Sequence, residues 1–493
     1  MHIEPTPEDS ESPEEQGSSP VPPNEFGPRE KLAIWLLLGS AFVVILNETV
    51  MGVATAVLMR ELSITAAAAQ WLTTAYMLTM SIIIPMTGLL IQRFSTKTLF
   101  TSAMTVFTVG TIIGAVAPGF ELLLVGRVVQ ASGTAVMMPL LMTTITTVAP
   151  PGKRGQFMGF VSILFSVAPA FGPVLSGFVL EWLSWRWLFI IMLPIVIVAL
   201  IVGTLRMPNV GVHKQARIDA LSIVLSGFAF GGIVYGLSAA GSAAVGTPTL
   251  APWIPLTVGA LGLGLFVWRQ IVLQRTDSAL LDLRVLTVRP YLNSVLLFMV
   301  SGVSLFGALF LIPLYAQTVL DFGPAITGLI VLPGSLLSGV LAPIVGRLVD
   351  RGAGHKLLVA GTTVTAISIW SMMLFDTDTH IWQLFATNIV MNIGLAGIFT
   401  PMNTIALGSL PSRLASHGSA MITTTQQLAG AAGTALLVTV MTLVAVNHAG
   451  IEAAESPESM VAGLRIAFLV SAILATLGIA VAALIREDSA KTT

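Results

Sequence analysis

Residues 32–55 read LAIWLLLGSAFVVILNETVMGVAT, an apolar run that contains one charged side chain, Glu48. An α-helix rises 1.5 Å per residue, so about 20 apolar residues in a helix cross the ~30 Å hydrocarbon core of a bilayer. This run is therefore predicted to be a transmembrane helix. A charge near its middle is costly in lipid, which makes Glu48 a candidate functional residue.

The rest of the 493-residue chain has the composition of a protein that crosses the membrane many times. Apolar residues make up 55% and charged residues 10%, against about 25% charged in soluble proteins. The net charge of −1 offers no basic stripe for nucleic acid. Cysteine is absent and the six histidines are scattered, so no metal site is expected. Without a nucleophile–base pair or nucleotide-binding loop, we expect neither an enzyme nor a cofactor nor the use of ATP.

Fourteen segments have the length and apolarity of membrane helices. They are predicted at 32–55, 66–91, 97–117, 121–147, 156–180, 186–206, 218–240, 250–272, 290–317, 324–349, 356–375, 382–408, 416–446 and 461–485. With these spans, 19 of the 23 Lys and Arg residues fall on the same side as both termini. Because basic loops stay in the cytoplasm, we predict a multi-pass protein of the inner (plasma) membrane with both termini cytoplasmic.

A short repeat divides the chain into related blocks. PMTGLLIQR at 85–93 aligns with PIVGRLVDR at 343–351, each at the end of a predicted helix. A repeated six-helix block indicates two bundles related by an axis along the membrane normal. We therefore expect an all-α 6+2+6 arrangement. Its parts are a disordered cytosolic tail at 1–30, a six-helix bundle at 31–206, two additional helices with a cytosolic linker at 207–285, a second six-helix bundle at 286–486, and a tail at 487–493.

Several motifs resemble the signatures of the major facilitator superfamily. The loop after the second span resembles G-x-L-x-D-R-x-G-R-K, and a related copy occurs in the second half. The fourth span resembles the family's fourth-helix signature, and the fifth span resembles the antiporter signature G-x8-G-x3-GP-x2-GG. The residues that carry these likenesses are Gly88, Gln92, Arg93 and Lys97; Gly346, Asp350 and Arg351; Arg127 and Gln130; and Gly159, Ala168, Pro169, Gly172, Pro173, Ser176 and Gly177.

Two further motifs resemble the fourteen-span drug:proton antiporters of this superfamily. LNETV at 46–50 is similar to their first-helix L-D-x-T-V, and WRWLF at 185–189 is similar to their W-R-W-x-F. The Asn-Glu-Thr form resembles the subgroup named for lincomycin resistance. The chain departs from the patterns at Gln92 and Asn47, which replace aspartates, and at Ala168 and Ser176, which replace glycines. The loss of the acid at Gln92 predicts a weaker cytosolic latch.

Glu48 and Arg127 are the two charged residues placed well inside a span. Counted along their helices, they lie about 10 Å and 9 Å from the outer ends of these spans, so their depths are similar. We interpret them as the proton-coupling pair. The alternatives are a structural ion pair for Glu48 and bundle packing for Arg127.

The remaining candidate residues are uncharged. Five polar side chains inside spans are predicted to line a substrate cavity, with interhelical hydrogen bonding as the alternative: Asn47, Gln130, Gln317, Asn392 and Gln426. The small residues and prolines of the fifth span are predicted to form a seam along which the bundles rock, although glycine and proline are common in membrane helices generally. Gly88, Arg93 and Lys97 are predicted to form a conformational loop, or simply a positive-inside anchor.

The resemblance implies a proton-coupled exporter of lipophilic drugs that works by alternating access. Because only one acid, Glu48, lies well inside a predicted span, we expect monocationic or neutral compounds to be carried and dications to be carried poorly. The expected partners are small-molecule drugs, protons and the lipid bilayer, and the unit is expected to be a monomer. A proton-coupled importer or lipid flippase of the same fold is the main alternative.

Overall fold

The computed structural model describes residues 27–209, 219–244, 250–275, 279–411, 414–451, 453–454 and 456–485. The described residues contain helices and no strand. The long helices and two short ones are α1 (Pro28–Leu62), α2 (Ala66–Ala69), α3 (Trp71–Arg93), α4 (Thr96–Val116), α5 (Phe120–Val148), α6 (Pro151–Trp182), α7 (Trp187–Ile190), α8 (Met192–Arg206), α9 (Ala220–Ala244), α10 (Trp253–Gln274), α11 (Arg289–Thr318), α12 (Pro324–Leu348), α13 (Gly354–Ser371), α14 (Ile381–Gly408), α15 (Ala415–Ala449) and α16 (Pro457–Leu484).

The predicted all-α membrane fold is confirmed. Thirteen helices among the described residues are long and apolar enough to cross a bilayer. The remaining predicted span, 156–180, lies within the 32-residue helix α6. Two predicted spans begin with a short helix, because α2 runs into α3 and α7 runs into α8.

Local sequence signals set several helix ends. Proline begins α1, where its missing N–H costs nothing. At the other end of α1, Ser63 adopts the left-handed conformation (φ 51°) and its N–H bonds to the Met59 carbonyl. The Ser95 hydroxyl accepts a hydrogen bond from the Thr98 N–H and thereby caps α4. These caps allow sharp turns between long neighbouring helices.

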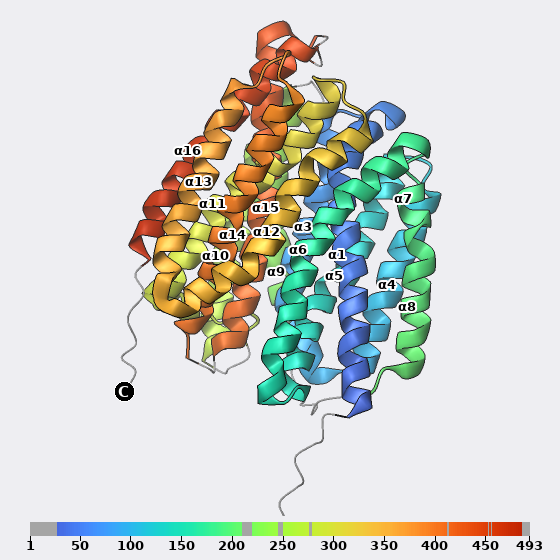
Figure 1. Cartoon of the computed structure of the whole chain (residues 1–493), viewed down its shortest axis with the longest axis vertical. Coiled ribbons are helices and arrows are strands. Elements are labelled where there is room, and N and C mark those ends of the chain that lie inside the picture. The colour runs from blue at the N-terminus through green and yellow to red at the C-terminus, as the bar shows by residue number, and fades with distance from the viewer. Residues whose placement is uncertain are drawn as a thin grey trace, which may run out of the picture.

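The helices form two groups that lie side by side (Figure 1). Helices α1 to α8 form one group, which we call the N-half, and α11 to α16 form the other, the C-half. Helix α9 packs against α3 of the N-half and α15 of the C-half, and α10 packs on α9. The start of α1 and the end of α16 point toward the same end of the molecule, which we call the termini end (Figure 1). The domain boundaries set from the sequence stay a prediction, and the tails at 1–26 and 486–493 lie outside the described residues.

Close contacts between the two halves are found at the end opposite the termini. There, the last turns of α6 meet the first turns of α12. A Cβ atom added to Gly177 would collide with the Pro324 carbonyl, and one added to Gly328 would collide with the Pro173 carbonyl. On the other side of the same region, Gln317 of α11 donates a hydrogen bond to the Val53 carbonyl of α1 (2.9 Å). Helix backbones can approach this closely only where side chains are absent.

Candidate functional site: a buried arginine beside an acid at the seam

Arg127 lies inside the N-half on α5 and is fully buried. Its Nη1 donates to the side-chain oxygens of Asn47 (3.0 Å) and Gln130 (3.1 Å), and its Nε donates to the Leu72 carbonyl (3.3 Å). These neutral acceptors come from α1, α5 and α3, so the guanidinium joins three helices. Its Nη2 has no hydrogen-bond partner. A buried cation with one open donor can accept a further anionic or polar partner.

An aromatic ring covers one face of this guanidinium. The Arg127 Cζ lies 4.0 Å from the centre of the Tyr76 ring on α3, which is a favourable cation–π contact in a dry environment. The Tyr76 hydroxyl bonds to Thr134 (2.6 Å), and Gln130 donates to the Thr111 hydroxyl (2.9 Å). These contacts hold the arginine and its partners in one arrangement.

Glu48 follows Asn47 on α1 but points to a different surface. Successive helical residues point about 100° apart, so Asn47 faces Arg127 while Glu48 faces the seam between the halves. Glu48 is partly buried and interacts electrostatically with Arg127 and with Gln427 of α15. Gln427 also reaches the Met80 sulfur (3.7 Å) on α3. The acid therefore lies between the N-half arginine and a helix of the C-half.

No ion pair within 4.0 Å joins Glu48 to Arg127, both of which the structure describes, and the guanidinium hydrogen-bonds to neutral acceptors instead. With Glu48 ionised, the site carries one positive and one negative charge. With Glu48 protonated, it carries an uncompensated positive charge. Protonation therefore changes the net charge at the seam by one unit without requiring a contact to break.

The five residues predicted to line a substrate cavity have different surroundings. Asn47 and Gln130 are buried partners of Arg127. Gln317 is buried in the contact between α11 and α1, with its side-chain oxygen unpartnered. Asn392 is buried in the C-half and bonds to Asn388 one turn earlier on α14. Gln426 lines a narrow cavity inside the C-half.

The residues of the fifth-span motif lie along α6. Gly172 packs against Thr49 and the Leu46 carbonyl of α1, where a Cβ atom would collide. Pro173 and Gly177 are buried against α12, and Pro169 is half-buried. Helix α6 therefore contacts the helix that carries Glu48 as well as the opposite half. The burial of Gly159 lies outside what the structure describes.

The loop motifs lie at the termini end. Gly88 and Arg93 are exposed, Lys97 is half-buried, and a Cβ atom on Gly88 would meet nothing within 4 Å. In the second copy Gly346 is half-buried and Arg351 is exposed. The side chains of Gln92 and Asp350 lie outside the described set, so the predicted weak latch stays a prediction.

Sequence reasoning missed three residues around the site: Tyr76, Thr111 and Thr134. The sequence offered one indication of this network: Arg127, Gln130 and Thr134 are spaced three and four residues apart, which places them on one face of α5. The partners from other helices depend on tertiary packing. Among the described residues, no group of three or more metal-ligating side chains occurs.

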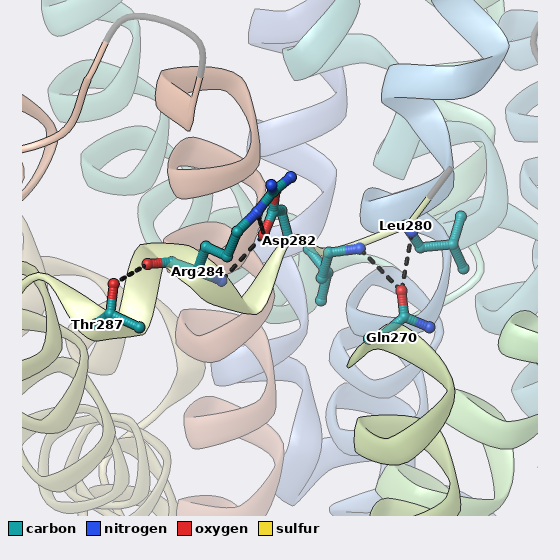
Figure 2. A network of polar contacts seen from close by, with 6 residues as sticks. Gln270, Leu280, Asp282, Arg284 and Thr287 are labelled. Atoms are coloured by element: carbon teal, nitrogen blue, oxygen red, sulfur yellow. Dashed lines mark hydrogen bonds and ion pairs between the residues drawn. The ribbon is translucent and has the colours of Figure 1, made fainter. Parts of the chain in front are cut away.

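A second polar network fixes the linker between the halves (Figure 2). The Gln270 side-chain oxygen accepts hydrogen bonds from the backbone N–H groups of Leu280 and Leu281 (2.9 and 3.2 Å). Nearby, Asp282 is buried and pairs with Arg284 (2.6 Å). Burial acts to raise the pKa of Asp282, but hydrogen bonds from Arg284 outweigh it and hold that pKa below its ordinary value.

An ion pair joins the start of α9 to the last turns of α10. Arg269 binds both carboxylate oxygens of Asp219 at 2.7 Å, and the Ser222 hydroxyl also donates to this carboxylate. The hydrogen bonds from Arg269 hold the pKa of Asp219 below its ordinary value. Gln270 donates to Ser222 (2.8 Å), so the ion pair and the linker contacts form one connected network that fastens α9 and α10 to the segment leading into the C-half.

Comparison with known proteins gives consistent matches over most of the chain. A sequence model of the Major Facilitator Superfamily matches residues 37–216 and 212–434. An uncharacterized transporter of this type, YcnB of Bacillus subtilis, is 40% identical over 90% of this chain and 93% of its own length. Lincomycin resistance protein LmrB of Listeria monocytogenes is 37% identical over 92% of this chain and 96% of its own. A multidrug resistance protein B homolog of Mycobacterium tuberculosis is 28% identical over 90% and 85%.

Solved structures show the same fold at low sequence identity. A bacterial homolog of the human lysosomal transporter Spinster superposes with a TM-score of 0.66 at 12% identity, covering 93% of this chain and 97% of that one. The peptide transporter POT gives 0.65 at 16% identity, covering 92% and 95%. At these sequence identities, the similarity to solved structures establishes the fold alone.

Proposed function

Because this chain belongs to the Major Facilitator Superfamily, we propose that it is a multidrug efflux transporter that exchanges protons for lipophilic monocationic or neutral drugs at the inner (plasma) membrane. The relatives named for lincomycin and multidrug resistance support drug export. The proposal places both termini in the cytoplasm, requires no ATP, and takes the monomer as the working unit.

The charge change at Glu48 is the proposed coupling step. Ionised Glu48 balances Arg127, so a monocation entering the seam meets a nearly neutral site. When a proton from outside neutralises Glu48, Arg127 is left uncompensated and repels the cation, which favours its release. A neutral drug is not repelled by Arg127, so its release depends on a conformational change. Protonation of Glu48 alters its contact with Gln427 of α15 in the opposite half, and thereby changes which arrangement of the two halves is favoured.

Alternating access follows from where the halves touch. Close contacts at the end opposite the termini run through Gly177 and Gly328 on one side and Gln317 on the other, while α3 also packs against α15 between the halves. In the proposed cycle these contacts separate while the termini ends close. Because Gly177 and Gly328 have no side chains that would interlock at the contact between α6 and α12, the two helices can move relative to one another there.

The single observation that carries the proposal is the position of Glu48, a partly buried acid between a buried arginine and the opposite half. The test uses everted membrane vesicles with an acidic interior, into which an exporter should drive ethidium. We expect Glu48→Gln to abolish this uptake. Glu61→Gln, which removes an exposed acid from the same helix, is the matched control and should retain it.

Gradient-driven ethidium uptake by well-expressed Glu48→Gln protein would refute the coupling role. Uptake in right-side-out vesicles with an acidic exterior, and none in everted vesicles, would instead identify the importer. Protein amount and membrane insertion are checked for every variant by detergent extraction and size-exclusion chromatography.

A further inference from the structure

Helix α9, the first of the two helices between the halves, binds both halves near the end opposite the termini. The Ser238 hydroxyl of α9 accepts a hydrogen bond from the Gln70 side-chain nitrogen (2.8 Å), and Gln70 lies directly before α3 in the N-half. The neighbouring Leu237 carbonyl accepts one from the Thr439 hydroxyl of α15 in the C-half (2.9 Å). Two consecutive residues of α9 therefore connect the halves. If the halves separate at this end, α9 can follow only one of them.

The attachment of α9 to α15 brings the two backbones close together. A Cβ atom added to Gly241 would lie only 3.1 Å from the Thr439 Cα atom. Val234 of α9 is fully buried and packs in one cluster with Ala431 and Ala435 of α15. Small residues permit this close approach, and close-packed helices of this kind move as one body.

The attachment of α9 to α3 uses the ends of longer side chains. The rings of Trp71 and Tyr235 lie 5.7 Å apart, and Met77 of α3 reaches the apolar cluster on α9 through its flexible thioether. Gln70 is fully buried and its side-chain oxygen has no partner. Water entering an opened end would bond both polar atoms of this amide, which offsets the loss of the bond to Ser238. Release from α3 is therefore less costly than release from α15.

We infer that α9 is a strap across the α3–α15 side of the molecule, fixed to α15 and released from α3 when the halves open at the end opposite the termini. The Gln70–Ser238 hydrogen bond is the contact that breaks. The inference rests on the proposed function, because it takes the two halves to alternate between openings at opposite ends. It gives the additional helix α9 a role in setting how readily this end opens.

The first test measures opening without transport. Ala56 of α1 is 2% exposed and packs in an apolar cluster formed mainly by the C-half, so a cysteine at this position should react with a maleimide chiefly when this end opens. The chain has no other cysteine. In purified Ala56→Cys protein in detergent, we expect Ser238→Ala to speed labelling about threefold to tenfold, because it removes the bond to α3. Thr439→Val is the matched control. It removes the bond between α9 and α15, and labelling should stay within about twofold.

Unchanged labelling in the Ser238→Ala protein would overturn the strap. Equal acceleration by Thr439→Val would overturn the assignment of α15 as its fixed side. Size-exclusion chromatography and thermal unfolding check that each variant is folded.

The second test locks each attachment in turn with a short, reducible bis-methanethiosulfonate cross-linker. Linking Gln70→Cys to Ser238→Cys should stop ethidium uptake in everted vesicles, and a reductant should restore it. Linking Gly241→Cys to Thr439→Cys should leave uptake within about twofold of the unlinked protein. Full uptake by completely linked Gln70→Cys/Ser238→Cys protein would contradict the strap. Absence of uptake before linking would contradict the proposed transport instead, and the maleimide test would still decide the strap.

Discussion

Replacing Asn47 by aspartate tests how charge is balanced around Arg127. The Asn47 oxygen accepts a hydrogen bond from Arg127 at 3.0 Å, so Asn47→Asp puts a carboxylate directly on the guanidinium with little change in shape. At an effective dielectric constant near 20, charges about 3 Å apart attract by about 5 kcal/mol. Taking a carboxylate out of water costs several kcal/mol. The two effects nearly offset, so the free energy of unfolding should change by less than about 2 kcal/mol.

The larger expected effect is on cation binding. The new carboxylate stays ionised beside Arg127 and compensates it, so ionised Glu48 becomes a net negative charge at the seam. A monocation about 12 Å away would gain about 1.4 kcal/mol, which is roughly a tenfold increase in affinity. Binding of a neutral compound should be unchanged. Proton-driven release should slow, because protonating Glu48 now produces a neutral site and no repulsion.

The assay compares tetraphenylphosphonium and chloramphenicol binding to purified Asn47→Asp protein, followed by ethidium uptake in everted vesicles. Asn47→Ala is the control: it removes the same hydrogen bond without adding charge, and should cost about 1.5 to 3 kcal/mol of stability with no gain in cation affinity. The reasoning fails if Asn47→Asp and Asn47→Ala bind the cation equally, or if the neutral probe gains as much as the cation.

Three further outcomes are expected. Gly328→Ala should push α6 and α12 apart, because the new methyl group collides with the Pro173 carbonyl. We expect slower ethidium uptake at normal expression, whereas an unchanged rate would mean that the contact tolerates a methyl group. Glu48 is the one acid well inside a predicted span, so a second positive charge on a drug would find no partner there. In resistance assays, we therefore expect much weaker resistance to a dication than to a monocation of similar size, and equal resistance would contradict a site with a single acid. Asp219→Asn should reduce stability by about 1 kcal/mol, since it breaks the bidentate pair with Arg269. Because the pKa of Asp219 is held below its ordinary value, that contribution should be complete above about pH 4 and be lost as the pH falls toward and through the lowered pKa, so denaturation should separate the two proteins more at about pH 7 than at about pH 3.5.

The sequence alone determined the class of fold. Apolar runs of membrane-spanning length, few charges and a repeated loop motif each depend on local composition and spacing, and a bilayer converts these directly into helices because no other open structure satisfies the backbone there. For the same reason Glu48 and Arg127 stood out as charges in apolar runs. The motifs in the first, fourth and fifth spans indicated the family to which the matches then assigned the chain.

Only the tertiary structure decided which residues meet. Each helix can rotate about its own axis, and the packing of its neighbours fixes that rotation. Asn47 and Glu48 are adjacent in sequence, yet Asn47 binds Arg127 while Glu48 faces the seam. Gln317 joins α11 to α1, and Asn392 bonds within its own helix. Periodicity gives the faces of one helix but not their partners, because the partners come from residues up to 347 positions away in the sequence.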